Sequence, residues 1–297
     1  MARQSPSRLA QVRARLDLPT VRFATGLLEG RHRSIFSGNG QDFDDMSHYQ
    51  PGDDVSVIDW KASAASGIPV IRRFVREANL AMVLAVDTGR GMAATAPSGE
   101  KKSEIATFAA ELICYLARAR GDLVALVAGD SENIVQIPAR GGVSHMELLL
   151  SRIDSMMTLD AAPSDAGRVL DRALTWFNRR SLIVLITDET RPRPEHEMTL
   201  KRLRTRHEVM VIQVADALPT NEDDLNIDDV DAHLDIPRFL RASPGLKREA
   251  EAFVQERRDE VRKMLRRRGI ESVRATSVDD LIDQLIAALG RQKRVSR

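Results

Sequence analysis

The stretch VLAVDTGRGMA, residues 83–93, leads one carboxylate, Asp87, out of a continuously apolar run and into a turn with two glycines. An unbroken apolar run of this length is typical of a strand that is covered on both faces of a sheet. The turn that follows could cradle a phosphate, form the first loop of a metal site, or simply connect the strand to a helix. The rest of the sequence has to distinguish these three interpretations.

Apolar strands and amphipathic helices alternate along the chain after residue 80. The runs DLVALVA, SLIVLITD and EVMVIQVAD predict buried strands, NIVQIPA predicts an edge strand, and IESVRAT predicts a last short strand. Apolar spacing of three and four residues predicts helices at 102–120, 143–156, 165–178 and 195–206, then a long charged helix after Gly245 and a final helix, SVDDLIDQLIAALG. This alternation predicts an α/β fold with a doubly wound, mostly parallel sheet over residues 80–297.

The chain before this domain is expected to have two parts. Residues 1–29 are a basic N-terminal arm. Residues 30–79 are predicted to form a small β-rich lobe, because strong turn signals alternate there with VSVIDW and IPVIRRFV, which are rich in β-branched residues. We expect Trp60 to anchor this lobe against the larger domain. The alternative is that Trp60 is a hot spot for a partner protein.

The composition excludes several classes of function. Hydrophobic residues make up 43% and charged residues 29% of the chain, and 44 basic residues balance 43 acidic ones, so no global field favours nucleic acid or a membrane surface. The N-terminal segment lacks the apolar core of a signal peptide, and the apolar runs are shorter than the roughly 20 residues of a spanning helix. We therefore expect a cytoplasmic protein that neither binds nucleic acid nor inserts into a membrane. Cys114 is predicted to be a buried structural thiol.

Polar side chains follow two of the predicted buried strands and precede one helix. Asp87 ends the first strand, Asp188 ends SLIVLITD, and Ser164 lies in APSDAG, which opens the helix leading into that strand. Binding sites in open parallel sheets form outside the carboxyl ends of the strands. Two carboxylates and a hydroxyl are hard oxygen ligands of the kind that Mg²⁺ prefers.

This order of residues resembles the metal-ion-dependent adhesion site of von Willebrand factor A domains. Upstream, the segments YQPGDD (49–54), IDWKASA (58–64) and RFVRE (73–77) resemble the signature of a bacterial family, the domain-of-unknown-function family fifty-eight. Its members resemble von Willebrand A domains and are often encoded beside MoxR-type AAA+ ATPases. The resemblance covers the chain from about Gly30 to the final helix. The residues of its upstream structural motif are Gly52, Asp53, Asp59 and Trp60.

The first loop of the expected site departs from the family pattern. The family has Asp-Thr-Ser-x-Ser-Met, whereas here Gly89 and Gly91 replace both serines and remove two oxygen ligands, and Arg90 adds a positive charge. The resemblance implies a Mg²⁺ site of Asp87, Ser164 and Asp188 completed by water. The alternatives are a vestigial site, or one that recognises a partner without metal. The expected partner-binding residues are Asp87, Gly89, Arg90, Gly91 and Asp188.

Enzymatic interpretations have less support in the sequence. Gly89-x-Gly91-x-x-Ala94 fits a loose dinucleotide fingerprint, but the helix should then begin at once, and Pro97-Ser98-Gly99 intervenes. Asp224, Asn226 and Asp228 have the opening spacing of a calcium loop that lacks its glycine and its final glutamate, which favours an exposed loop. No serine or cysteine nucleophile has a recognisable base, so no catalytic residues are assigned.

The resemblance therefore implies a non-catalytic adaptor that works with a MoxR-type AAA+ ATPase. Its task would be chaperone-like maturation or metal loading of a client complex that the sequence does not identify, with methanol dehydrogenase-type assembly as the most specific version. One alternative is a nucleotide- or small-molecule-binding enzyme on the same sheet. A further alternative is a structural scaffold with a dead metal site.

Overall fold

The computed structural model describes residues 43–49, 58–74, 81–217, 228–229, 234–235 and 244–295. The main sheet has six strands in the order β10-β7-β6-β3-β4-β5. Their bounds are β3 (Ala81–Asp87), β4 (Leu123–Gly129), β5 (Ile134–Arg140), β6 (Leu182–Asp188), β7 (Glu208–Val214) and β10 (Glu271–Ala275). All neighbours are parallel except β5, which pairs antiparallel with β4. The predicted doubly wound, mostly parallel sheet is confirmed.

The order of the strands places a topological switch point between β3 and β6. From β3 the chain builds outward through β4 to β5, and it then returns to add β6, β7 and β10 on the other side. Ligand crevices in doubly wound sheets lie outside the carboxyl ends of the strands at such a point. Asp87 and Asp188 are the last residues of these two adjacent strands.

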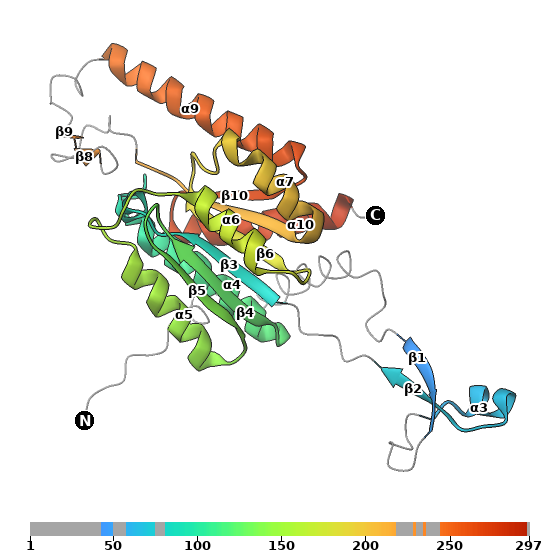
Figure 1. Ribbon diagram of the computed structural model, residues 1–297. Helices are drawn as coiled ribbons and strands as arrows, with labels where there is room; N and C mark the ends of the chain where they lie inside the picture. The colour runs from blue at the N-terminus through green and yellow to red at the C-terminus, as the bar shows by residue number, and fades with distance from the viewer. Residues whose placement is uncertain are drawn as a thin grey trace, which may run out of the picture.

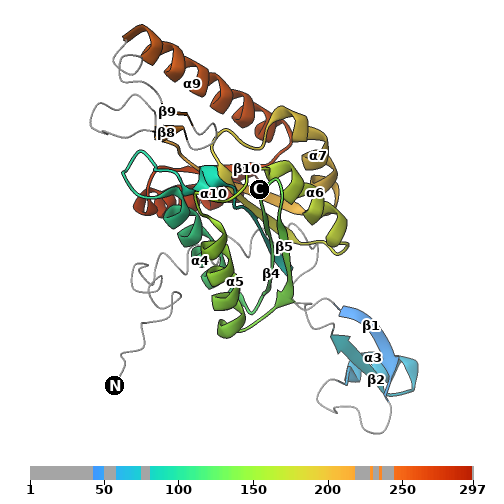
Figure 2. The same cartoon turned by 60° about the vertical axis from the view of Figure 1, so that its left-hand side comes forward.

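Helices cover both faces of the sheet (Figures 1 and 2). One face carries α4 (Lys102–Arg120), α5 (Val143–Met156) and α10 (Val278–Val295), and the other carries α6 (Ala166–Trp176), α7 (Glu197–Arg206) and α9 (Pro244–Arg267). Along β3, Met82, Leu84 and Val86 pack on the α4 side, whereas Val83 and Ala85 pack on the α6 side. This double burial explains the unbroken apolar run, since each fully buried aliphatic side chain contributes about 1.5–3 kcal/mol.

The predicted helices agree with the structure to within a few residues. Residues 102–120 and 143–156 match α4 and α5 at both ends. Gly121 ends α4 in the left-handed conformation, with φ 76°, and Cys114 is fully buried inside that helix. Burial raises the pKa of the Cys114 thiol above its usual value. The prediction that the Cys114 thiol is buried is therefore confirmed.

The outermost parts of the sheet domain differ in character. Edge strand β5 contains Pro138 and is partly exposed along its length, as the sequence predicted.

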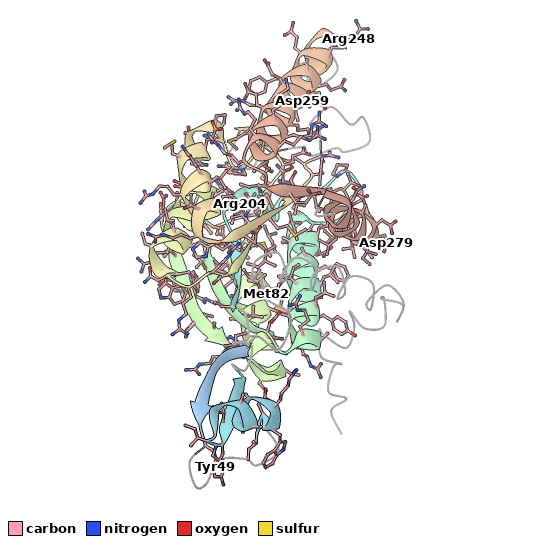
Figure 3. The ribbon with its side chains drawn as sticks, turned by 90° about the vertical axis from the view of Figure 1, so that its right-hand side faces the viewer. Tyr49, Met82, Arg204, Arg248, Asp259 and Asp279 are labelled. Atoms are coloured by element: carbon pink, nitrogen blue, oxygen red, sulfur yellow. The ribbon has the colours of Figure 1, made fainter. Side chains whose placement is uncertain are left out.

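Figure 3 shows Met82 inside the domain, and Arg248 and Asp259 along α9, whose side chains project outward. Two short antiparallel strands, β8 (Asp228–Asp229) and β9 (Leu234–Asp235), lie in the acidic excursion. Asp224 and Asn226 fall outside the described residues, so the exposed loop expected there stays a prediction.

The N-terminal elements are β1 (Phe43–His48), α3 (Trp60–Ser66) and β2 (Val70–Phe74), with β1 and β2 antiparallel. The strand predicted in IPVIRRFV is confirmed over β2. Of the strand predicted in VSVIDW, residues 55–57 lie outside the described residues and Ile58 forms a β-bridge. The prediction is wrong at Trp60, because the Asp59 carboxylate accepts hydrogen bonds from Lys61 N and Ala62 N at 3.0 Å and so begins a helix there.

The expected anchoring role of Trp60 is also wrong. Its side chain is 69% exposed, and no residue of α3 is buried. Gly52, Asp53 and the basic arm lie outside the described residues. The β-rich lobe and the boundary at residue 79 therefore stay predictions. Within the described part of the chain, no helix combines the length and the apolar character needed to cross a membrane.

Candidate functional site

Asp87 is held by its own loop and by the neighbouring strand. Its Oδ1 accepts a hydrogen bond from Gly89 N at 3.2 Å, and its Oδ2 accepts one from the Thr187 hydroxyl of β6 at 3.0 Å. The side chain is fully buried. Burial raises the pKa of Asp87, although the Arg191 guanidinium and the two hydrogen bonds oppose that rise. Both carboxylate oxygens thus serve to fix the β3 loop.

Asp188 forms a buried ion pair with Lys102. The Lys102 ammonium donates to Oδ2 of Asp188, while Oδ1 accepts from the backbone N and hydroxyl of Thr190 at 2.8 and 2.7 Å. Asp216 Oδ2 lies 3.3 Å from the same ammonium. Burial alone would raise the pKa of Asp188, but the attraction and hydrogen bond of Lys102 outweigh it and lower that pKa to about 2. Likewise, burial opposes the charge on Lys102, yet the two carboxylates raise its pKa above its usual value.

The sequence did not lead us to predict Lys102 as a site residue, although one feature of its position pointed to it. It is the first residue of α4, and a cation in the first turn of a helix opposes the helix dipole. An anion elsewhere in the fold is one way to compensate such a residue, and here that anion is Asp188.

Ser164 lies directly against Gly89. A Cβ atom on Gly89 would stand 2.3 Å from both Cα and N of Ser164 and 2.5 Å from its Oγ. The two loops are also joined by a hydrogen bond from Arg90 N to Ala162 O at 3.0 Å, and Arg191 Nη1 donates to Ser164 O at 2.9 Å. Glycine at position 89 is therefore required by close approach of the 162–164 loop, which fills the space of the missing serine side chain.

The donor set does not fit the magnesium ion that the resemblance implies. Mg²⁺ needs a near-octahedral shell of oxygens, but the oxygens of Asp87 and Asp188 already accept internal hydrogen bonds. The Lys102 ammonium and the Arg191 guanidinium supply positive charge beside these carboxylates. The Ser164 hydroxyl is buried without a hydrogen-bond partner, and is the only expected ligand left unengaged among the three. No cluster of three potential metal ligands occurs in the described residues.

The expected partner-binding residues differ in accessibility. Asp87, Gly89 and Asp188 are buried, whereas Arg90 and Gly91 are half-buried at the start of the short 3₁₀ helix η2 (Arg90–Ala93). The structure brings all five to one edge of the sheet. A protein approaching this edge would meet Arg90 and Gly91 rather than the carboxylates.

Residues 45–231 match the protein family described as "Protein of unknown function DUF58". The chain belongs to this family. An uncharacterized protein of Mycobacterium tuberculosis is 25% identical to this DUF58 chain over 295 residues, covering 97% of this chain and 90% of the relative.

Two solved structures show distant similarity to this DUF58 protein. One is an aerotolerance-related membrane protein from Bacteroides fragilis, with 14% identity, a TM-score of 0.43, and coverage of 71% of this chain and 99% of that chain. The other is a von Willebrand factor type A protein from Catenulispora acidiphila, with 11% identity, a TM-score of 0.38, and coverage of 74% and 45%.

Another buried carboxylate of the DUF58 chain, Glu189, follows Asp188 and was also missed. Its Oε2 accepts from Arg274 Nε of β10 at 2.6 Å, and its Oε1 pairs with Arg258 of α9 and accepts from Asp216 N at 3.2 Å. Glu189 is 1% exposed. The loop that follows β6 is thereby tied to both α9 and β10.

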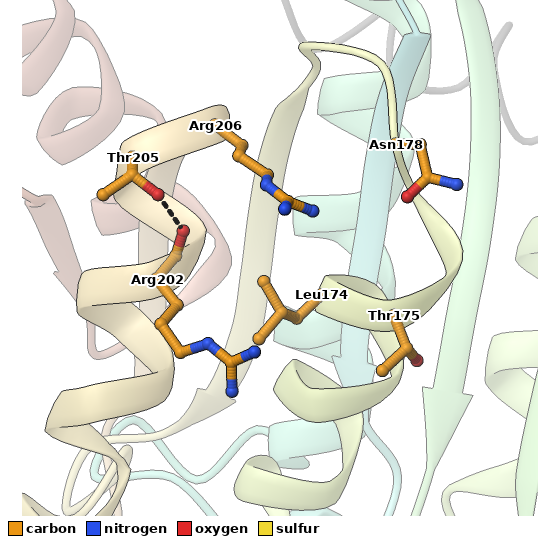
Figure 4. Close-up of a pocket in the computed structure, with 6 residues that line it drawn as sticks. All are labelled: Leu174, Thr175, Asn178, Arg202, Thr205 and Arg206. Atoms are coloured by element: carbon orange, nitrogen blue, oxygen red, sulfur yellow. Dashed lines mark hydrogen bonds between the residues drawn. The ribbon is translucent and has the colours of Figure 1, made fainter.

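A shallow pocket of about 320 Å³ lies between the C-terminal ends of α6 and α7. It is lined by Leu174, Thr175, Asn178, Arg202, Thr205 and Arg206. Figure 4 shows the guanidinium groups of Arg202 and Arg206 extending from α7 toward α6. Because α6 leads into the first residue of β6, this pocket lies at the sheet edge opposite Asp188, and it contains no residue expected from the sequence.

Proposed function

We propose that this DUF58 protein is a non-catalytic interaction protein that works with a MoxR-type AAA+ ATPase. Its task would be chaperone-like maturation or metal loading of a client protein complex. The observation that best supports a non-catalytic role is the internal engagement of Asp87 and Asp188. A general base must reach a substrate proton, whereas these carboxylates are buried and hydrogen-bonded within the loops that they hold.

The nucleotide-binding alternative has little support at the β3–α4 turn. A dinucleotide would need free backbone N–H groups at a helix that begins directly after the glycines. Here α4 begins at Lys102, whose N donates to Ala94 O at 2.8 Å, and the ammonium of that residue pairs with Asp188. The backbone N–H and the side chain of the first residue of α4 are therefore both bonded to groups of the protein itself.

The contact with the ATPase is proposed to include Trp60. The family motif Ile-Asp-Trp builds a capped helix, α3, with Asp59 as the cap and Trp60 as its exposed first residue. Exposed tryptophans are enriched among residues that dominate binding energy at protein interfaces. The exposure of Trp60 thus favours the hypothesis that it binds a partner protein over the hypothesis that it anchors the lobe.

Binding to the MoxR-type ATPase encoded nearest to this protein tests the proposal. Biolayer interferometry with nucleotide-free ATPase allows a chelator to be added without disturbing Mg-ATP. We expect saturable binding that survives the chelator. Absence of binding by protein with a cooperative thermal transition would contradict the adaptor role. NTP turnover by the isolated chain that is lost on Asp87→Ala would favour the enzymatic alternative.

A further inference from the structure

We propose that the Lys102 ammonium is the resident cation of the β3–β6 loop site, and that it closes this site to divalent metal ions. In this arrangement a side chain of the protein takes the electrostatic role that a metal has in adhesion-type sites. The inference concerns the isolated chain and holds whether or not the ATPase is the partner.

The first support is the geometry of the ammonium. Lys102 comes from the start of α4, Asp188 from the end of β6, and Asp216 from just beyond β7. These elements converge so that Nζ contacts Asp188 Oδ2 and lies 3.3 Å from Asp216 Oδ2. The Lys102 side chain is 0% exposed, and Asp188 is 10% exposed. A cation therefore already bridges the carboxyl ends of two strands.

The second support is the charge that a divalent ion would encounter. An ion bound by Asp188 would stand next to a buried ammonium, where low dielectric strengthens repulsion between like charges. It would also have to displace the hydrogen bonds of Thr190 on the other oxygen of Asp188. A metal could bind only if Lys102 left its pocket, which would leave an ammonium without its two carboxylates.

The third support is steric and does not depend on Lys102. Gly89 lies too close to Ser164 to carry any side chain, so the space for a serine side chain at position 89 is filled by Ser164. The loss of ligand oxygens and the gain of an internal cation act in the same direction. Together they make a site in which the Lys102 ammonium, not a metal ion, balances the charge of the carboxylates.

The same geometry implies a latent metal site. Substitution of Lys102 by the neutral methionine would leave Asp188 and Asp216 facing one another without a cation. A divalent ion is the simplest replacement, with a Kd on the order of 10⁻⁴–10⁻³ M as in weak carboxylate sites. Lys101, the preceding lysine, is exposed and provides the matched control.

Mn²⁺ binding followed by electron paramagnetic resonance tests this with four proteins. We expect no site-bound Mn²⁺ for the wild type or Lys101→Met, and one bound ion for Lys102→Met that is lost in Lys102→Met/Asp216→Asn. Wild-type binding that Asp188→Asn abolishes would overturn the proposal. Failure of a folded Lys102→Met protein to bind Mn²⁺ would overturn the claim that Lys102 is what excludes the metal.

A measurement on the wild type covers the case in which Lys102→Met does not fold. A buried, hydrogen-bonded ammonium exchanges its protons slowly enough for its ¹⁵N-bound proton signal to be seen by NMR, and Lys102→Arg assigns that signal by its loss. We expect millimolar Mg²⁺ to leave the signal unchanged. A shift or disappearance of the signal on addition of Mg²⁺ would contradict a resident ammonium.

Discussion

Lys102 Nζ and Asp188 Oδ2 form a buried ion pair between residues that are 86 positions apart in the chain. The pair joins the first residue of α4 to the last residue of β6, across the switch point of the sheet. It therefore fixes the start of one helix to a strand other than the one that precedes it.

Asp188→Asn should destabilise the protein by about 3–5 kcal/mol at neutral pH, because it leaves the buried Lys102 ammonium with Asp216 alone. The pKa of Asp188 is lowered to about 2 from an unfolded value of 3.8, so its stabilisation is present above pH 3.8 and is lost as the pH falls toward 2. Urea unfolding of both proteins at several pH values measures this. A stability difference that stays constant down to pH 2 would contradict the ion pair as its source.

Asp87→Asn should have the opposite effect and raise the melting temperature at pH 7.5. Burial raises the pKa of Asp87, so the folded state favours the protonated form, and this favourable contribution is lost as the pH rises through the folded pKa. The isosteric amide oxygen can still accept the Gly89 hydrogen bond. Differential scanning calorimetry of Asp87→Asn, Asp188→Asn and the wild type gives the sign of each change in melting temperature. A lower melting temperature for Asp87→Asn would indicate that its charge is needed.

Gly89→Ser, which restores the serine of the family pattern, should destabilise the protein by about 1–3 kcal/mol and create no Mg²⁺ site. The new Cβ would collide with the backbone of Ser164 at 2.3 Å. Gly141→Ser is a suitable control, since its Cβ would stand 3.4 Å from Leu123 Cδ2. Chemical denaturation with and without Mg²⁺ measures both effects. Mg²⁺-dependent stabilisation of Gly89→Ser would show that the loop can reopen.

Glu189→Gln should loosen α9 selectively. Arg258 and Arg274 would lose a shared carboxylate that is 1% exposed, at a cost of about 2 kcal/mol after allowance for the partial exposure of both arginines. Hydrogen exchange read by mass spectrometry should show faster exchange near the C-terminal half of α9 with α4 unchanged. Equal acceleration in α4 would point to global destabilisation instead.

Trp60→Ala should weaken binding to the MoxR-type ATPase at least tenfold, which corresponds to about 1.4 kcal/mol, without changing the melting temperature. Phe253→Ala, which removes another exposed aromatic side chain (58% exposed), is the control and should leave binding unchanged. Titration by interferometry compares the two. Equal affinities for both variants and the wild type would remove Trp60 from the interface.

The sheet domain was predictable because burial on both faces leaves a direct trace in the sequence. The strands β3, β6 and β7 and the helix over residues 102–120 could each be recognised from the residues of that segment alone. The position of Asp87 and Asp188 at the same edge of the sheet followed from the rule for parallel strand ends. Lys102 could not be placed beside Asp188, because that contact depends on which strands become neighbours. The helix at Trp60 was missed because the β-branched run before it outweighed the capping signal of Asp59.

The antiparallel edge strand β5 has a consequence for how copies of this protein can associate. An exposed strand edge is a template on which another chain can add, and proline lacks the N–H group that such addition requires. Pro138 interrupts the donor row of β5, and Pro138 and Arg140 are exposed on it. Another chain that added to β5 would find no backbone donor at Pro138, which disfavours sheet extension at this edge.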